Sequence, residues 1–364
     1  MVKRCARLGA AAFTLVELMV ATGVVVLLAA VLFALISHFT ENVRTTRSTA
    51  DELETAQRAF ETLTRRVGQA TLNSYWESYV VSGSIRRYER ISELRFACGP
   101  MQAGASPLAD LRAKQERMFP GHGICFQATT GQTGITRDPA LTGLENLLNT
   151  WGYFVEAGRD ELQAPAILPP QVAGRPIAPR LMELREPTQQ LCLYRYTNGV
   201  ANKYYAGFEW FRAPLADRAL VRTVAENIAA LIILPKLTAQ ETERLQPGAT
   251  GEERDAFLAP HLFYHSATVP PPNTEPARNM RHRLPATVEI TMVALNAATV
   301  ARLYHPDDLD PLKLRDAFLD ARTLHTELQL DPAQPALDSL ERRLIAAHAS
   351  YRLFTAAVPI RSAQ

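Results

Sequence analysis

The chain has 364 residues, of which 47% are hydrophobic and 21% are charged, and its formal net charge at pH 7 is +2. This length is ample for a large globular head in addition to other segments. Because the basic residues are dispersed among acidic ones, the composition argues against a nucleic-acid partner.

The N-terminal segment predicts one membrane-spanning helix. Lys3, Arg4 and Arg7 precede the stretch from Leu18 to Ile36, which has no charged residue. At 1.5 Å per residue this stretch gives roughly 28 Å of helix, close to the hydrocarbon core of a lipid bilayer. Since basic residues favour the cytoplasmic side, we expect a cytoplasmic N-terminus and a remainder outside the cytoplasm.

A secretory signal peptide and an uncleaved signal anchor are the alternatives. A signal peptide places small residues after its apolar region, whereas Ala10, Ala11 and Ala12 lie before it. A simple anchor leaves Glu17 unexplained. A carboxylate within a membrane helix costs about 2 to 3 kcal/mol on insertion scales, and such groups usually have a partner or a function.

Residues 13–19, Phe-Thr-Leu-Val-Glu-Leu-Met, resemble the processing motif of type IV prepilins and type II secretion pseudopilins. The resemblance implies that a prepilin peptidase cuts between Ala12 and Phe13 and methylates Phe13. It also implies that Glu17 helps to align each incoming subunit with the terminal amine of its neighbour. The partners implied are other pilin-like subunits and an inner-membrane assembly platform. The implied location is the inner membrane, with a periplasmic or extracellular head, and then the assembled filament.

One position departs from the family pattern. The family usually has glycine before the cut, where this chain has Ala12. Cleavage after Gly9 would leave Glu17 out of register, so we expect cleavage after Ala12. The expected segments are therefore a leader at 1–12 and a transmembrane helix at 13–36.

Beyond the membrane, apolar residues recur at steps of three and four, which predicts an amphipathic stem helix at 37–73. No proline interrupts residues 13–73, so a single helix of about 60 residues is expected. The stripe residues expected to pack are Phe39, Val43, Leu53, Phe60, Leu63 and Val67.

Residues 74–296 predict a β-rich, pilin-like head. Apolar or alternating runs predict strands at 91–97, 123–129, 153–157, 190–196, 228–234 and 287–294. Because these runs do not alternate regularly with helices, we expect an α+β fold with the N-terminal helix packed on an antiparallel sheet. Proline-rich stretches at 165–179 and 260–276 are expected as loops.

Residues 297–364 predict a C-terminal helical extension. Helices are expected at 310–328 and 336–347, followed by a final strand at 351–359.

Five segments of the head are similar to the family called Verru_Chthon cassette protein C. They are RISELRF at 90–96, LLNTWGY at 147–153, RLMEL at 180–184, AENIAALIILP at 225–235 and LPATVEITM at 284–292. This resemblance implies a pilin-like protein encoded beside other such proteins. A weaker likeness, to the minor pseudopilin J and minor pilin W classes, implies a subunit that initiates or caps a fibre. A large head would crowd a closely packed filament, which also favours a position at the tip.

The cysteines predict buried thiols more than a disulfide framework. Cys5 would be lost with the leader, and the remaining Cys98, Cys125 and Cys192 allow one bridge at most. Cys125 and Cys192 lie in apolar, strand-like runs, which favours free buried thiols.

Metal and catalytic motifs are weak. His261 and His265 are bracketed by prolines and lack a third ligand nearby. Asp307, Asp308 and Asp310 could supply oxygen ligands to calcium, but a solvated loop in which Asp310 caps a helix is favoured. No nucleophile elbow, Walker loop or dinucleotide fingerprint occurs. We therefore expect that the protein is not an enzyme and that it has no catalytic residue and no cofactor. A calcium ion at these three aspartates is the one weak candidate.

These observations predict a minor pilin-like subunit at or near the tip of a pilus or pseudopilus, serving secretion or surface attachment. Two alternatives differ from it in class. The first is a membrane-tethered adhesin or substrate-binding ectodomain that uses the proline-rich loops. The second is a tethered envelope enzyme.

Overall fold

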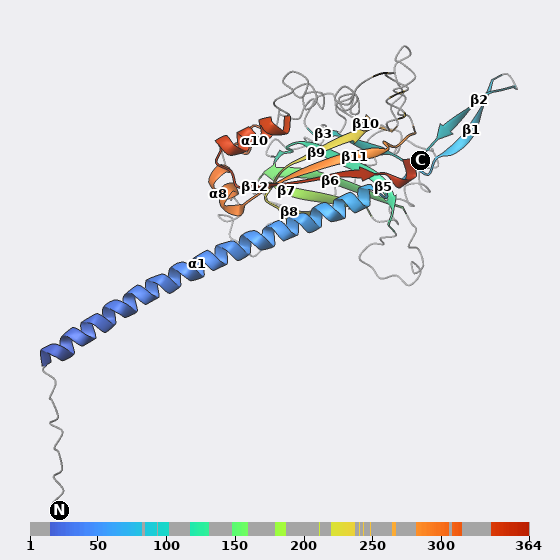
Figure 1. Cartoon of the computed structure of the whole chain (residues 1–364). Helices are drawn as coiled ribbons and strands as arrows, with labels where there is room; N and C mark the ends of the chain where they lie inside the picture. The colour runs from blue at the N-terminus through green and yellow to red at the C-terminus, as the bar shows by residue number, and fades with distance from the viewer. Residues whose placement is uncertain are drawn as a thin grey trace, which may run out of the picture. The chain divides into compact units, whose positions relative to one another are not determined.

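The computed structural model shows an N-terminal apolar helix followed by antiparallel β-sheets, an α+β arrangement (Figure 1). The chain forms two compact units, Met1–Asp51 and Glu52–Gln364. The structure describes residues 15–81, 84–92, 94–101, 117–130, 148–158, 179–186, 211, 220–236, 240, 243, 248, 264–266, 282–305, 308–314 and 336–363.

Helix α1 runs from Leu15 to Val67 without a break. It ends six residues before the predicted limit, because the chain there turns onto strand β5 (His122–Thr129). The amide of Thr71 donates to the carbonyl of Gln127 (2.9 Å), and Ala70 forms a bridge with Ala128. A helix continuing to residue 73 would lose these tertiary bonds.

The described strands form three antiparallel sheets. The largest has the order β10-β3-β5-β6-β7-β8, with β4 paired to β6; the second has the order β12-β11-β9; and β1 pairs with β2. The other strands are β1 (Tyr75–Val81), β2 (Ser84–Ile91), β3 (Phe96–Pro100), β4 (Arg117–Met118), β6 (Leu148–Gly158), β7 (Arg180–Glu186), β8 (Val221–Glu226), β9 (Ile228–Lys236), β10 (Tyr264–His265), β11 (Thr287–Leu295) and β12 (Tyr351–Pro359).

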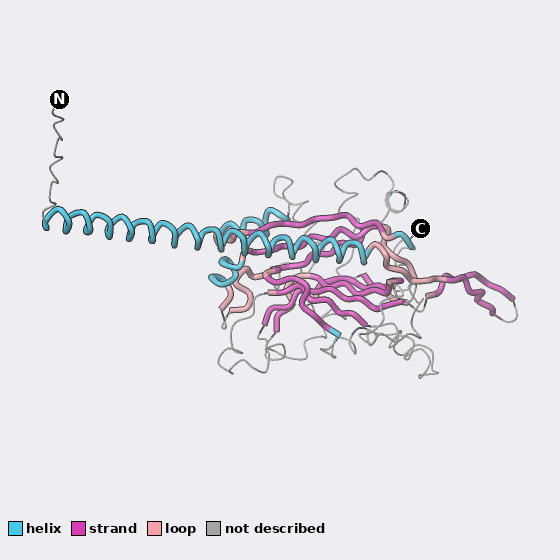
Figure 2. The backbone as a smooth tube through the Cα atoms, turned by 90° about the horizontal axis from the view of Figure 1, so that it is seen from below, coloured by secondary structure: helices cyan, strands magenta, loops and turns pink. Residues whose placement is uncertain are grey.

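The C-terminal part joins the same body as the predicted head. Strand β12 pairs along its whole length with β11, so the last strand completes a sheet begun by β9. Helices α8 (Ala297–Leu303) and α10 (Ala336–Ala346) lie between these strands in the sequence, and a short 3₁₀ helix, η5 (Arg361–Ala363), follows β12. Figure 2 shows the strands of the body in a second view.

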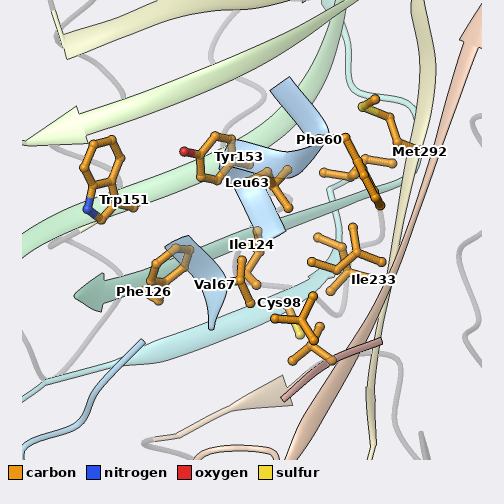
Figure 3. Packing of buried hydrophobic residues seen from close by; sticks show 14 of the residues in the cluster. Phe60, Leu63, Val67, Cys98, Ile124, Phe126, Trp151, Tyr153, Ile233 and Met292 are labelled. Carbon is orange, nitrogen blue, oxygen red and sulfur yellow. The ribbon is translucent and has the colours of Figure 1, made fainter. Parts of the chain in front are cut away.

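Three apolar clusters hold this body together. The first contains the last turns of α1 and side chains from both larger sheets, and Figure 3 shows Leu63 and Val67 among Ile124, Tyr153 and Ile233. The second packs α8 and α10 on the opposite side of β9 and β11. The third covers the other face of the seven-stranded sheet, where Phe211 contributes. Each of the two larger sheets thereby has buried apolar residues on both faces.

The two larger sheets meet at Gly121 and His122. Gly121 forms a parallel bridge with Leu231 of β9, and the amide of Ile233 donates to Nδ1 of His122 (3.1 Å). Gly121 has φ of +83°, and a Cβ atom there would lie 2.4 Å from the carbonyl oxygen of Leu231. Only glycine allows this backbone approach without a shift of one sheet.

Several predicted strands agree with the structure, although most of the observed strands are longer than the predicted ones. Residues 123–129, 153–157, 228–234 and 287–294 lie within β5, β6, β9 and β11, and residues 351–359 are β12. The helix predicted at 336–347 is α10. The strand predicted at 190–196, the proline-rich stretch 260–276 except residues 264–266, and almost all of 165–179 lie outside the described residues.

Two predicted elements were wrong in the described part. The strand predicted at 91–97 is divided, because β2 ends at Ile91 and β3 begins at Phe96. Between them the Ser92 hydroxyl donates to the carbonyl of Leu72 and accepts from the amide of Leu94, which competes with strand pairing. Residues 310–314, predicted to begin a helix, instead form a turn with Lys313 at φ of 51°.

The close approach at Gly121 gives a testable prediction. Gly121→Ala should lower the free energy of unfolding by about 3 kcal/mol or more, because the added methyl group overlaps the Leu231 carbonyl. Thermal unfolding of the full chain in detergent micelles measures this loss. Gly248→Ala is the matched control, since Gly248 has the same φ of +83° but no atom of the described residues within 4 Å of its Cβ position. Equal losses in the two variants would show that strain alone, and not the contact between sheets, requires glycine.

Candidate functional site

The segment Leu15–Ser37 of α1 is long and apolar enough to cross a membrane. Glu17, in its first turn, is its sole charged residue. The hydroxyls of Thr22 and Ser37 donate to carbonyls in the preceding turn, those of Leu18 (2.9 Å) and Phe33 (2.8 Å). Each of these hydroxyl groups therefore donates its hydrogen bond within the helix, so it needs no water molecule as acceptor. Ala12 and Phe13 lie outside the described residues.

The predicted stem residues fall into two groups. Phe60, Leu63 and Val67 are buried in the first cluster, and Leu53 is half-buried. Phe39 is 71% exposed, and the side chain of Val43 lies outside the described part. Burial within the chain therefore begins near the start of the second unit.

Glu52, the first residue of that unit, contacts two other elements. Its Oε2 accepts a hydrogen bond from the amide of Ala297 at the start of α8 (3.2 Å) and one from Nδ2 of Asn227 (3.4 Å). Asn227 occupies the turn between β8 and β9 with φ of 62°, a conformation that asparagine tolerates better than most residues. The carboxylate thus fixes α1 to the end of the β-sheets.

The densest polar cluster of the described residues lies beneath α1 and is centred on Glu183 of β7. Its carboxylate forms an ion pair with Arg66 of α1, accepts from the Tyr153 hydroxyl (2.9 Å) and pairs with Arg222 of β8 (2.7 Å). Arg66 also donates to the Tyr153 oxygen (2.5 Å) and stacks over Trp151 at 3.9 Å. Stacking and bidentate contacts suit the planar guanidinium of arginine.

The pKa of Tyr153 supports a structural role for this cluster. Burial first, and then the Glu183 carboxylate, raise the pKa of Tyr153 far above its ordinary value. The phenol therefore stays a neutral hydrogen-bond donor at physiological pH. Because tyrosine, glutamate and arginine here satisfy one another, the cluster supplies registration of α1 on the sheet and no free nucleophile.

The two cysteines in the described part are free and buried. Cys98 belongs to the first apolar cluster and Cys125 to the third, on opposite faces of the sheet, although β3 and β5 are adjacent. Burial raises the pKa of both thiols well above the ordinary value, which keeps them protonated and unreactive. Cys192 lies outside the described residues.

The predicted calcium loop is partly described. Oδ1 of Asp310 accepts the amide of Leu314 (2.6 Å), and Oδ1 of Asp308 accepts the amide of Asp310 (3.0 Å). These carboxylates therefore stabilise a turn of their own loop. Asp307 lies outside the described residues. Within the described ranges, no group of three or more histidine, cysteine, aspartate or glutamate side chains is placed to hold a metal ion.

The histidine pair of the sequence is also only partly described. His265 is buried in β10, and His261 lies outside the described part. Burial first, and then the nearby Arg95 charge, lower the pKa of His265 to about 4. This histidine is therefore neutral at physiological pH.

Sequence reasoning did not predict the β1–β2 hairpin. Trp76 is 70% exposed and Tyr88 is 64% exposed, the first on β1 and the second on β2. Two strand-forming runs rich in aromatic and β-branched residues, joined by Ser82 and Gly83, were the available signal. The Glu183 cluster had no comparable signal, because Arg66 is 117 residues from Glu183 in the sequence.

Comparisons with protein-family models, curated proteins and solved structures found no match to this chain. Membership of the prepilin or cassette family therefore stays a prediction, which rests on residues 13–19 and on the five segments of the head given above.

The buried ion pair gives a second prediction. Arg66→Met should lower the free energy of unfolding by about 3 to 5 kcal/mol, because it removes the buried charge partner of Glu183. The double variant Arg66→Met, Glu183→Leu should recover part of that loss. Arg58→Met is the matched control on the same helix: its pair with Glu54 is exposed, so its loss should stay within about 1 kcal/mol.

Denaturant unfolding of the full chain in detergent micelles measures all three variants. A loss for Arg66→Met no larger than that for Arg58→Met would contradict the assigned role.

Proposed function

We propose that this chain is a minor type IV pilin-like subunit, a pseudopilin, anchored in the inner membrane with its N-terminus in the cytoplasm. A prepilin peptidase would cut it between Ala12 and Phe13 and methylate Phe13. The subunit would then join other pilin-like subunits, through an inner-membrane assembly platform, at or near the tip of a pilus or pseudopilus. The fibre would serve secretion or surface attachment.

One observation carries this proposal. The apolar segment Leu15–Ser37, with Glu17 near its start, continues as the same helix to Val67, whose last turns are buried against antiparallel sheets. A signal peptide that is removed would have no reason to share a helix with the core. The apolar segment and the buried turns therefore belong to one helix, as expected for a retained anchor.

Glu17 is the residue through which the assembly would be aligned. An isolated carboxylate in the apolar layer is costly, whereas a carboxylate paired with the terminal ammonium of a neighbouring subunit is much less so. Cleavage before Phe13 places the new amine four residues from Glu17, one helical turn away. The pairing would favour a fixed stagger between adjacent helices.

The processing step is tested by intact mass and N-terminal sequencing of the protein from native membranes. The chain should begin at N-methylated Phe13, and at Met1 when the prepilin peptidase gene is deleted. A chain that begins at Met1 in both strains would contradict the proposal. The terminal amine of Phe13, which is proposed to pair with Glu17 of a neighbouring subunit, would then not form.

The alignment role is tested separately. Glu17→Ala and Glu17→Val should leave cleavage nearly unchanged but reduce recovery of the subunit in sheared fibres or in cross-linked subunit complexes by about tenfold, the effect of losing about 1.4 kcal/mol. Thr22→Val is the control, since it changes another polar residue of the same segment without removing a charge. Normal incorporation of both Glu17 variants would contradict the role of the carboxylate.

A further inference from the structure

The β1–β2 hairpin is a two-stranded sheet in the described part of the chain. Among the strands that the structure describes, β1 and β2 pair with each other and with no other strand. Both views show this ribbon extending away from the larger sheets (Figures 1 and 2). A two-stranded hairpin is marginally stable in water, and a third strand or a covering element is normally needed. The hairpin therefore has a structural reason to take up a partner.

One face of the hairpin has the composition of a protein interface. The register pairs Trp76 with Arg90 and Ser78 with Tyr88, so these four residues share a face. Trp76 and Tyr88 are diagonal neighbours on it and are both mostly exposed. Nε of Arg90 donates to Oγ of Ser74 (2.5 Å) at the base. Tryptophan, tyrosine and arginine are the residues most enriched where binding energy concentrates.

The charge of β2 selects the partner. Its eight residues include Arg86, Arg87 and Arg90 against Glu89, a net charge of +2 from three positive and one negative residue. Every twofold antiparallel pairing of β2 with a second copy, centred anywhere from Arg86 to Arg90, places two like charges directly opposite each other, which is destabilising. The charge pattern therefore disfavours β2 of a second copy as the added strand and favours an acidic strand, as another chain could supply.

The size of the hairpin shows that this contact does not act alone. One added strand covers less than the roughly 800 Å² per partner that a stable complex buries. A partner held in the same membrane or fibre has a high effective concentration, which makes a small contact sufficient. This step rests on the proposed function, because the tether is the membrane helix.

We propose that β2 accepts an extended, acidic segment of a different membrane-anchored subunit as a third strand of this sheet. Backbone hydrogen bonds along the edge of β2 that no described strand occupies supply affinity, and the acidic side chains match its arginines. Side chains of the added strand pack beside Tyr88, and the body of the partner covers Trp76. The hairpin is then the element that distinguishes one neighbouring subunit from another.

Site-specific photo-cross-linking of the full chain in native cells tests the proposal. The photoreactive p-benzoyl-phenylalanine replaces Tyr88, on the hairpin, or Ile345, which is 61% exposed on α10 and serves as a matched surface control. The same group at Val24 reports contacts of the membrane helix. The Tyr88 adduct should map by mass spectrometry to an acidic, extended segment of another membrane-anchored protein, and Ile345 should not give it.

Charge reversal decides whether the arginines select that segment. Arg87→Glu should reduce the Tyr88 adduct about tenfold, and replacing acidic residues of the mapped segment by lysine should restore it. Arg361→Glu, a charge reversal on exposed η5, should leave the adduct unchanged. Thermal unfolding of each variant confirms that the body is intact.

The other outcomes are decisive. A Tyr88 adduct with a second copy of this chain, with lipid, or with a segment that lacks acidic residues overturns the inference. A Val24 adduct without a Tyr88 adduct overturns the inference alone and leaves the proposed function standing. Absence of both adducts contradicts the inference and the proposed function together.

Discussion

The burial of the last turns of α1 is the constraint on which the rest of the structure depends. Phe60, Leu63 and Val67 contribute to one apolar cluster with side chains from both larger sheets, so these sheets share a core through the helix. Arg66, on the same turns, adds a charged contact to Glu183 that fixes the register of the helix. Apolar packing supplies most of the stability, and the ion pair opposes alternative alignments of the helix along the sheet.

The same constraint links the fold to the proposed function. A helix whose end is buried in a core, and whose beginning is long and apolar enough to span a membrane, has a reason to remain uncleaved between the two. Glu52 lies where burial begins, and its carboxylate contacts the end of the sheets and the start of α8. The apolar residues of Leu15–Ser37 have no comparable burial within the chain, which is the condition for packing against lipid or neighbouring helices.

Binding and anchoring occupy separate parts of the sequence in this proposal. Three buried polar side chains show this: the Tyr153 phenol and the Cys125 thiol stay protonated, and the Glu183 carboxylate is paired with Arg66, so all three are suited to packing. Among the described residues beyond α1, the exposed large aromatic side chains are Tyr75, Trp76 and Tyr88, all on the β1–β2 hairpin. An assembly built in this way would use the helices for general cohesion and the hairpin to choose a neighbour.

The sequence by itself determined the elements whose signal is local. The uncharged stretch after Glu17 predicts the apolar helix, the three-four spacing of Phe60, Leu63 and Val67 predicts its buried face, and runs such as 228–234 and 351–359 predict strands. Tertiary structure decided what depends on distant residues: the end of α1 at Val67, the division of the strand at Ser92, the requirement for glycine at Gly121, and the pairing of Arg66 with Glu183. The physical reason is that hydrogen bonds and close contacts between residues 20 to 117 positions apart leave no periodic pattern in the chain, whereas burial of one face of a helix or strand does.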